Sequence, residues 1–422
     1  VWIDSQTEEE ILRGIREAKD LSEYDSLADA AYLRAKEDYL MGINFSRVLT
    51  LKYGNTISSY LKLQKNTVIA VGRVMTCVQG MIVKREREIR QFVETPFYRV
   101  LAKCRLGSGV FEAEWRAAEG SVYYASPKLY KENGFNKEED ARALIELLSG
   151  SAMAPNIRTM GLEPPVTAVV AGVEKKKENK SAPLLFNLAE LQNECSRLFK
   201  ISPDETLRIT QELYEKKLVT YPRTDARVLS TAVAKEIHKN IGGLKNYEPA
   251  EGFAAEILSG DSYKTIAKTK YTNDKQITDH YAIIPTGQTG AVRGLSAMAA
   301  KVYDAIVKRF LAIFYPPAVY QKIAVVLKKD TESLYSSFKV LISEGYLKVA
   351  GIPASQSRSS KANDDETEDV KCDSAMLELL QKLKKGDIIP IGEFFIKEGK
   401  TSPPKRYTSG SLILAIENAG QL

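Results

Sequence analysis

The spacing of apolar residues divides the chain into helical and strand-rich stretches. Near the start they recur at helical spacing, which predicts one helix with Thr7 as its N-cap and Glu10 completing a capping box. A second helix is predicted from about residue 26 to residue 45. From about Val93 the period becomes two around the turn Gly107-Ser108-Gly109, which predicts a β-hairpin.

Farther along, the two patterns alternate. A helix is predicted between Asn136 as cap and Gly150 as stop, followed by a long strand in PPVTAVVAGVEKK. Strand patterns return only in VYQKIAVVLKK and SSFKVLISEGYLKV, and residues from about 181 to 310 are mostly helical. The predicted architecture is multidomain α+β, a strand-rich domain with an inserted helical domain. Two chain crossings near residues 180 and 310 form a natural hinge.

Composition restricts the classes of protein that fit. The 422 residues are 44% hydrophobic, which suits about two to four globular domains. No apolar run is long enough to span a bilayer and the first residues lack a signal-peptide pattern, so no membrane association is expected. The widely spaced cysteines fit the reducing cytoplasm. The chain opens on VWI without methionine, so we expect it to begin inside a longer polypeptide.

Metal and nucleotide chemistry receive little support from the sequence. The four cysteines are scattered and only two histidines are present, so neither a zinc site nor a disulfide framework is expected. The acids of PASQSRSSKANDDETEDVK are predicted to lie in a mobile, solvated loop rather than to bind magnesium. No glycine motif for phosphate binding occurs.

One tyrosine follows a helix with well-marked ends. Ser202 is predicted as the N-cap of that helix, with Pro203 in the first turn, Glu205 completing a capping box and an end near Lys217. A short extended piece leads to Tyr221, and the proline after it keeps the tyrosine out of helical conformation. Tyr221 is therefore expected at the end of an element, a common position for catalytic residues.

The neighbours of Tyr221 suit phosphate chemistry. A phenol can attack a phosphodiester and hold the phosphate as an ester, provided that nearby groups balance the charge on phosphorus. Arg223 lies on the same side of an extended strand, and its guanidinium can bind phosphate through two hydrogen bonds. Thr224 and Asp225 are placed to hold this geometry, with Arg227 nearby. Local physics alone favours the alternative, a structural tyrosine at a strand end.

The wider pattern resembles the type IA DNA topoisomerases. QELYEKKLVTYPRTD matches their active-site signature element for element, and ITDHYAIIPT is similar to their histidine segment. GINFSRVLTLKYG and VGRVMT resemble their gate segments, and TSPPKRYTSGSLILAIENAG resembles their late Pro-Pro-x-Arg motif. The set follows the family order along nearly the whole chain. GINFSR and WIDSQTEEEI are most similar to the bacterial topoisomerase III branch.

The resemblance implies roles for individual residues. Tyr221 would be the nucleophile that keeps the 5′ phosphate of the cleaved strand, Arg223 would stabilise the scissile phosphate, and His280 would assist cleavage. The residues alone favour a hydrogen-bonded, partly buried imidazole for His280 and a surface salt bridge for Arg34 with Asp38. The DNA-binding positions that the resemblance implies are Arg34, Asp38, Arg47, Arg73, Thr224, Asp225 and Arg406.

The resemblance also implies a toroidal core. Residues 1–80, completed by about 385–422, would form a helical DNA gate, 81–180 with 311–384 a strand-rich arch, and 181–310 an inserted catalytic-tyrosine domain. The implied activity is cleavage of one strand, strand passage and religation without ATP, which relaxes negative supercoils and decatenates DNA. Magnesium is implied for the full-length protein, with its ligands in a Toprim domain that precedes this chain in the family. No metal site is therefore expected here, and the chain alone is expected to be inactive.

Three positions depart from the family pattern. Met75, Tyr281 and Ser409 stand where a glutamine, a second histidine and an acid are usual. The implied partners are single-stranded and negatively supercoiled DNA, with a helicase left open, and a monomer is expected. The main alternative is a non-catalytic module that binds single-stranded nucleic acid. A tyrosine nickase or recombinase is a weaker alternative because the histidines at 238 and 280 supply neither a metal-binding pair nor an Arg-His-Arg-Tyr set.

Overall fold

The computed structural model describes residues 8–65, 67–150, 166–277, 279–351 and 374–418. The chain forms two compact units, of which the first contains residues 1–92, 184–310 and 404–422 and the second 93–183 and 311–403. The sequence places the inner borders near 180 and 310, close to these, but the outer borders near 80 and 385. The outer borders differ because one helix continues to Gln91 and one strand to Lys400.

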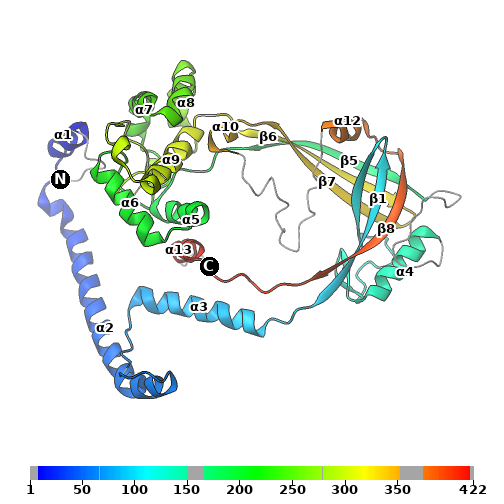
Figure 1. Cartoon of the computed structure of the whole chain (residues 1–422), viewed down its shortest axis with the longest axis horizontal. Helices are drawn as coiled ribbons and strands as arrows, with labels where there is room; N and C mark the ends of the chain where they lie inside the picture. Colours follow the sequence, from blue (N-terminus) through cyan, green and yellow to red (C-terminus); the bar gives the residue numbers. More distant parts are fainter. Residues whose placement is uncertain (1–7, 66, 151–165, 278, 352–373, 419–422) are drawn as a thin grey trace. The chain divides into compact units, whose positions relative to one another are not determined.

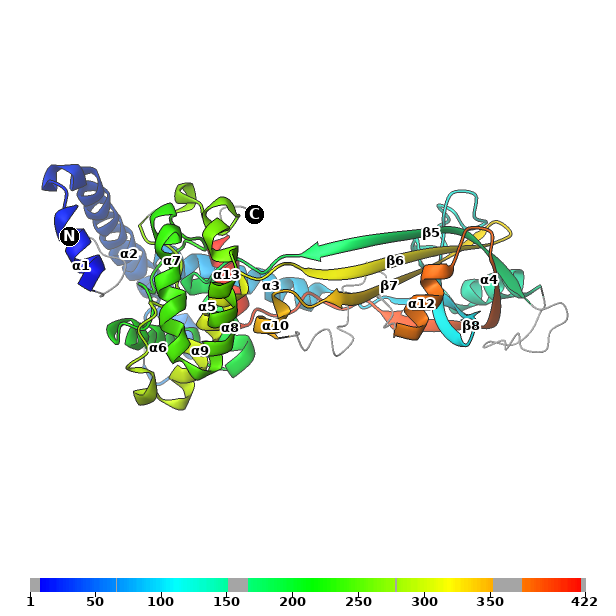
Figure 2. The ribbon, with the colours of Figure 1, turned by 90° about the horizontal axis from the view of Figure 1, so that it is seen from above.

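The second unit is built on a closed antiparallel sheet. The strands β1 (Pro96–Leu106) and β2 (Gly109–Arg116) form the predicted hairpin, and Gly107 takes a φ of 58° at its turn. Neighbouring strands follow the order β2-β7-β6-β5-β8-β1, and the β1–β2 pairing closes the circle. The long strands β5, β6 and β7 run side by side (Figures 1 and 2). The other bounds are β5 Thr167–Lys180, β6 Ala318–Lys329, β7 Glu332–Ser343 and β8 Ile388–Lys400, with short β3 (Leu129–Lys131) and β4 (Gly134–Phe135) attached to β1.

Strand β8 is an element that the sequence pattern does not predict. Its buried side chains are Ile389, Ile391 and Phe394, so the inward-facing positions do not follow a strict period of two. The pairing with β1 explains the break, because Lys103 pairs with Glu393 and the next residue, Cys104, pairs with Ile391. The extra residue is a β-bulge, which moves later side chains to the opposite phase.

Helix α4 (Glu138–Ser149) packs on β1, β4 and β8. The predicted cap is wrong: Lys137 holds the N-cap position, and Asn136 instead donates a side-chain hydrogen bond to the carbonyl of Pro127 at 3.1 Å. The predicted stop is confirmed, because Gly150 ends the helix with a φ of 69°. Two short helices, α10 (Leu347–Ala350) and α12 (Ser374–Lys382), complete the unit.

The first unit is helical, as predicted for residues 181–310. Its helices α5 to α9 cluster together in Figure 1. Their bounds are α5 Leu188–Phe199, α6 Pro203–Glu215, α7 Thr231–Gly243, α8 Glu248–Ser259 and α9 Ala297–Ala312. The short 3-10 helices between them are η2 Leu244–Asn246, η3 Ser262–Lys268, η4 Asp274–Gln276 and η5 Val292–Gly294.

The same unit contains α1 (Glu8–Arg16), η1 (Leu21–Tyr24), α2 (Asp25–Tyr60), α3 (Arg73–Gln91) and α13 (Ser409–Glu417). Helix α2 extends well past the predicted end at residue 45. The predicted cap Thr7 and the acidic segment 353–371 lie outside the described residues. No helix in the described ranges is both long and apolar enough to cross a bilayer.

The segment of residues 67–71, which belongs to no helix or strand, lies along α2. Backbone amides of alternate residues donate to hydroxyl groups of the helix: Thr67 to Ser58 at 2.7 Å and Ile69 to Thr50 at 2.9 Å. A third bond, from Val71 to Ser46, measures 2.9 Å. These bonds bring the chain to the first residue of α3, and they satisfy backbone donors that a sheet would otherwise pair.

Candidate active site

Helix α6 leads the chain to Tyr221. The Ser202 hydroxyl accepts a hydrogen bond from the Glu205 amide at 3.1 Å, which confirms the predicted N-cap. After the helix, Lys217 takes a φ of 61° and turns the chain away from the helix axis. The residues that follow, 218–225, are called the tyrosine loop below.

Two buried threonines fasten the tyrosine loop to the segment of residues 280–286. The Thr220 hydroxyl donates to the carbonyl of Ala282 and accepts from the amide of Ile284, both at 3.0 Å. The Thr224 hydroxyl donates to the carbonyl of His280 at 2.7 Å. Because both threonines are almost completely buried, water does not compete for these bonds. The backbone is therefore fixed on each side of Tyr221.

This arrangement places Tyr221 against His280. The centroids of the two rings lie 4.5 Å apart, with an angle of 49° between the ring planes. The phenol ring of Tyr214, from α6, packs edge-on against Tyr221 with a centroid distance of 5.5 Å. Tyr221 and His280 are both partly exposed. A phenol held between an aromatic ring and an imidazole has one orientation and remains accessible to a ligand.

The charged residues of the tyrosine loop point to solvent. Arg223 and Asp225 are exposed, and within the described residues the Arg223 guanidinium forms no hydrogen bond or ion pair. Arg227 is instead engaged, because its guanidinium pairs with Glu190 at 2.8 Å and contacts the carbonyl of Leu185. Arg223 is thus the cation of this stretch that is available to an anionic ligand.

A second group of predicted residues meets where α2 faces α3. Arg73 binds Asp38 through two hydrogen bonds, from Nε at 2.6 Å and from Nη2 at 2.9 Å. These bonds, and the charge of Arg34 nearby, hold the pKa of the Asp38 carboxyl below its ordinary value. Asp38 therefore pairs with Arg73 in this structure, and its DNA-binding role stays a prediction.

The two other predicted arginines are also exposed. Arg47 lies on α2, and Arg406 precedes α13. Arg406 binds Glu86 of α3 through Nε at 2.6 Å and Nη2 at 3.1 Å, which lowers the pKa of Glu86. Arg85 of the same helix donates to the carbonyl of Lys405, so the late motif is attached to α3 by two arginines.

Comparison with known proteins decides the family. The sequence model of the DNA topoisomerases matches residues 22–420. The chain belongs to this family. Its curated relatives include DNA topoisomerase 3 of Bacillus subtilis (strain 168), 31% identical over 99% of this chain and 50% of the relative. The protein of the same name from Bacillus licheniformis is 30% identical over 99% of this chain and 50% of the relative. The predicted resemblance to the topoisomerase III branch is confirmed.

A solved structure of a DNA topoisomerase agrees at the level of the fold. Full-length topoisomerase I from Thermotoga maritima is 21% identical and superposes with a TM-score of 0.64, covering 100% of this chain and 58% of that chain. The predicted fold class, the multidomain α+β core of type IA topoisomerases, is thereby confirmed. The topoisomerase chain described here spans about half the length of the curated relatives it matches.

The three departures from the usual topoisomerase pattern lie in different surroundings. Met75 is exposed on α3, two residues after Arg73. Tyr281 is buried and lines a pocket of about 840 Å³ together with Thr220. Ser409 is the exposed first residue of α13, directly after the capping residue Thr408. Tyr281 is thus the departure that lies beside the tyrosine loop.

The structure does not supply the magnesium ligands that a type IA topoisomerase implies. Among the described residues, no group of three or more histidine, cysteine, aspartate or glutamate side chains is arranged to hold a metal ion. The carboxylates near Tyr221 are not converging ligands, since Asp225 is exposed and Glu190 is paired with Arg227. No magnesium-dependent step is therefore derived from these residues.

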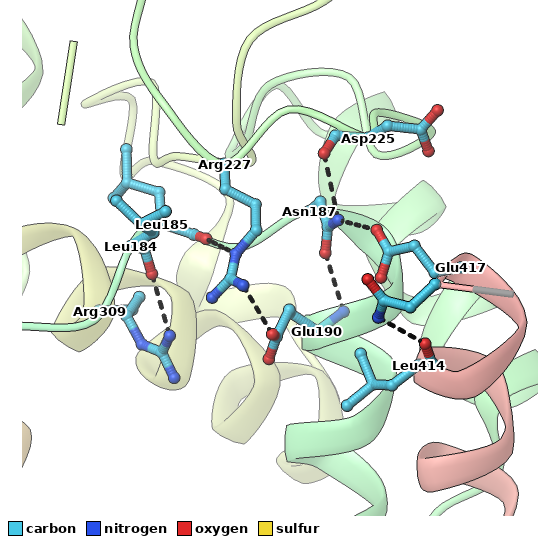
Figure 3. Close-up of polar contacts among 10 residues, drawn as sticks. Leu184, Leu185, Asn187, Glu190, Asp225, Arg227, Arg309, Leu414 and Glu417 are labelled. Carbon is cyan, nitrogen blue, oxygen red and sulfur yellow. Dashed lines mark hydrogen bonds and ion pairs between the residues drawn. The ribbon is translucent and has the colours of Figure 1, made fainter. Parts of the chain in front are cut away.

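Sequence reasoning missed two residues that hold the tyrosine loop. Thr220 is recognisable only from its burial and its partners in the fold, since a threonine before a tyrosine carries no signal of its own. Asn187 caps α5 and also contacts the loop (Figure 3). A sequence signal for its capping role was available in FNLAEL, where Glu190 follows the asparagine by three residues.

Proposed function

We propose that the full-length protein is a type IA DNA topoisomerase of the topoisomerase III branch, with Tyr221 as its nucleophile. The observation that carries the proposal is the pairing of Tyr221 with His280 at a ring distance of 4.5 Å, beside Arg223, whose exposed guanidinium binds no other residue in the part of the chain that the structure describes. The family match adds the context in which a tyrosine beside an arginine serves phosphodiester chemistry.

In the proposed reaction the phenolate oxygen of Tyr221 attacks a phosphorus atom of one DNA strand. A P–O bond forms to Tyr221, and the bond from phosphorus to the 3′ oxygen breaks. The 3′ oxygen takes up a proton and leaves as a hydroxyl, while the tyrosine retains the 5′ phosphate. Because one ester replaces another, religation by the reverse attack needs no ATP.

Two neighbours assist this exchange. The guanidinium of Arg223 donates to the non-bridging oxygens, where negative charge builds up in the transition state. Loss of a single donor of this kind costs about 100-fold to 1,000-fold in rate. His280 touches the phenol ring and is the candidate for proton transfer during cleavage and religation. Thr224 and Asp225 complete the loop that presents these groups.

Single-stranded DNA is the proposed ligand of the exposed cations on α2, α3 and the late motif, namely Arg34, Arg47, Arg73 and Arg406, and a bound phosphate would replace Asp38 as the partner of Arg73. Binding through such residues releases counterions and therefore weakens as salt rises. Negatively supercoiled DNA as substrate, decatenation, a helicase partner, a monomeric state and a cytoplasmic location belong to the same proposal.

The proposal keeps the role that the resemblance implies for each domain. Residues 1–92 with 404–422 act as the DNA gate, 93–183 with 311–403 as the arch, and 184–310 as the catalytic-tyrosine domain, with the borders of the two compact units in place of those expected from the sequence. The chain crosses between the two compact units at 183/184 and 310/311, and these crossings are the proposed hinge. Magnesium is proposed for the complete enzyme. Its ligands are proposed to lie in the part of the curated relatives that this chain does not cover.

The test is the substitution Tyr221→Phe in the full-length protein. It is expected to abolish relaxation of negatively supercoiled DNA by magnesium-supplied enzyme while leaving affinity for a single-stranded oligonucleotide unchanged, because only the attacking oxygen is removed. Tyr124→Phe is the matched control, since Tyr124 is an exposed tyrosine of the second unit. Relaxation at the wild-type rate in Tyr221→Phe would remove Tyr221 from the mechanism. Absence of relaxation in the wild type would favour the non-catalytic binding module.

A further inference from the structure

Asn187 uses both ends of its side chain at the base of the tyrosine loop. The side chain is only 1% exposed. Its Oδ1 accepts from the amide of Glu190 at 2.9 Å, which caps α5. Its Nδ2 donates to the carbonyl of Asp225 at 3.2 Å and to Glu417 Oε1 at 2.5 Å, as Figure 3 shows.

Helix capping accounts for only one of these bonds. A cap requires the oxygen Oδ1 alone, and serine, threonine or aspartate supply it equally well. The amide nitrogen is the feature that distinguishes asparagine from those residues, and here both of its hydrogens are used. The part of the side chain that capping does not need is the part that faces the tyrosine loop.

The start of α5 therefore holds two consecutive carbonyl groups of the loop. Besides the bond from Asn187 to Asp225, the backbone amide of Leu188 donates to the carbonyl of Thr224 at 3.2 Å. These carbonyls follow Tyr221 by three and four residues. Upstream of the tyrosine, Thr220 is already fixed to Ala282 and Ile284. Asn187 thus supplies an anchor on the downstream side.

Glu417, from α13, orients the amide of Asn187. It accepts the second hydrogen of Nδ2, so the amide cannot rotate without losing this bond and the bond to Asp225. Partial burial raises the pKa of the Glu417 carboxyl, with the nearby carboxylates of Glu190 and Asp225 acting in the same direction. The hydrogen bond from Asn187, and to a smaller extent the charge of Arg227, offset part of this effect. Helix α13 packs directly on α5, and Gly410 permits this close approach at Asn193.

We propose that Asn187 is a positioning residue for the nucleophile Tyr221, with Glu417 holding its amide in the orientation that anchors the tyrosine loop. The inference rests on the proposed function of Tyr221. In this proposal, the contact between α5 and α13 determines where the phenol oxygen of Tyr221 lies relative to a bound phosphate. Displacement of a reacting group by about 1 Å costs on the order of 100-fold in rate.

The discriminating variant is Asn187→Asp in the full-length protein. Aspartate keeps an oxygen to cap α5 but loses both donors of the amide. We expect the single-turnover rate of cleavage of a labelled single-stranded oligonucleotide to fall about 10-fold to 100-fold, with its dissociation constant unchanged. Asn273→Asp is the matched control, because Asn273 also accepts from a backbone amide as an N-cap of the same unit.

A second pair of variants keeps the proposal testable if Asn187→Asp does not fold. Glu417 is on the exposed surface of α13, so Glu417→Ala is expected to fold and to slow cleavage, whereas Glu417→Gln, which retains an oxygen acceptor, restores most of the rate. Cleavage at the wild-type rate in Asn187→Asp, or in Glu417→Ala, overturns the inference. The same assay on Tyr221→Phe separates the two proposals: persistent cleavage there refutes the function of Tyr221, whereas its loss together with normal Asn187→Asp refutes only the positioning role.

Discussion

Tyr221 owes its position to uncharged neighbours. Thr220 and Thr224 fix the backbone on either side, and the rings of Tyr214 and His280 hold the phenol. The sequence motif drew attention to charged residues, since arginine and aspartate have an evident relation to phosphate. Hydroxyl groups that bind backbone carbonyls carry no such signal, because their role exists only once the segment of residues 280–286 has folded beside them.

The ion pair between Asp38 and Arg73 limits the charge available to DNA. The pKa of Asp38 is lowered, chiefly by the hydrogen bonds from Arg73, so the carboxyl is charged at neutral pH. The stabilisation that this pair contributes is present above the ordinary pKa of aspartate and is lost as pH falls through the lowered pKa. At neutral pH a phosphate must therefore compete with Asp38 for Arg73.

Asp38→Asn is expected to remove the charged partner that holds Arg73 through two hydrogen bonds, leaving only the longer ion pair with Glu37 at 3.6 Å, and so to tighten binding of single-stranded DNA at low salt. The slope of log K against log salt concentration should become steeper by about 0.7, the value for one additional phosphate contact on a single strand. Asp29→Asn is the charge-matched control, because it removes an exposed carboxylate of α2 that the structure does not pair with arginine. The measurement is fluorescence anisotropy over a salt series. Equal slopes in the two variants would show that Arg73 does not gain a phosphate.

At the scale of elements, the sequence pattern located some helix ends and most of the long strands, and it missed elements whose ends depend on tertiary contacts. Ser202 and Gly150 were predictable because capping and a left-handed stop depend on one residue and its immediate neighbours. Strand β8 was not, because the bulge opposite Lys103 and Cys104 breaks the alternation on which strand prediction depends. The length of α2 was also underestimated, since its later turns present hydroxyls and glycine to residues 67–71 rather than an apolar stripe.

Gly54 tests the close packing of residues 67–71 on α2. A Cβ at Gly54 would lie 2.9 Å from the carbonyl oxygen of Thr67, closer than side chains normally approach. We expect Gly54→Ala to destabilise the first unit by about 1–2 kcal/mol, because overpacking outweighs the gain in helix propensity of about 1 kcal/mol. The amide of Thr67, which is bound to Ser58, should exchange with solvent faster.

The matched control is Gly80→Ala in α3, where a Cβ would meet no atom within 4 Å. This variant should gain up to about 1 kcal/mol of stability, because alanine is the better helix former. Thermal unfolding and hydrogen exchange of both variants make the comparison. A stabilised Gly54→Ala with unchanged exchange at residues 67–71 would refute the close packing.

At the scale of the whole molecule, the chain passes back and forth between the two compact units, so that each unit is built from separate segments. The inner crossings at 183/184 and 310/311 were predictable because the apolar period changes there from two to helical and back. The crossing at 92/93 lies where the period of two begins, although the predicted border was set at residue 80, and the crossing at 403/404 was not predicted because strand β8 continues to Lys400. The family was predictable mainly from the ordered set of motifs, not from local chemistry at Tyr221.

The second unit contains a buried carboxylate whose loss should destabilise that unit. Glu332 is 1% exposed and accepts hydrogen bonds from Trp115 Nε1 and the Ser121 hydroxyl, both at 2.6 Å, and from the Val122 amide at 2.8 Å. Glu332→Ala leaves these three donors without a partner, each at a cost of about 1–3 kcal/mol, whereas a fourth donor, the hydroxyl of the exposed Thr331, can bind water instead. We expect an early unfolding transition seen by Trp115 fluorescence in a Trp2→Phe background.

In Glu332→Ala the first unit should unfold at the same temperature as in the wild-type protein, because the substituted residue lies in the second unit. Glu119→Ala is the control, since Glu119 is an exposed acid two residues before Ser121, one of the donors to Glu332. Far-ultraviolet circular dichroism, dominated by helices of the first unit, is compared with the tryptophan signal. A single transition shifted equally in both signals would contradict the independence of the two units.

The central claim is that Tyr221 forms the covalent bond with DNA. It is tested most directly by identifying the residue to which the DNA is attached. The full-length protein is incubated with a single-stranded oligonucleotide, denatured during turnover and digested, and the DNA-linked peptide is sequenced by mass spectrometry. The account predicts a 5′-phosphate ester on the peptide that contains Tyr221, and no adduct from Tyr221→Phe. An adduct on any other residue, or one that persists in Tyr221→Phe, would contradict it.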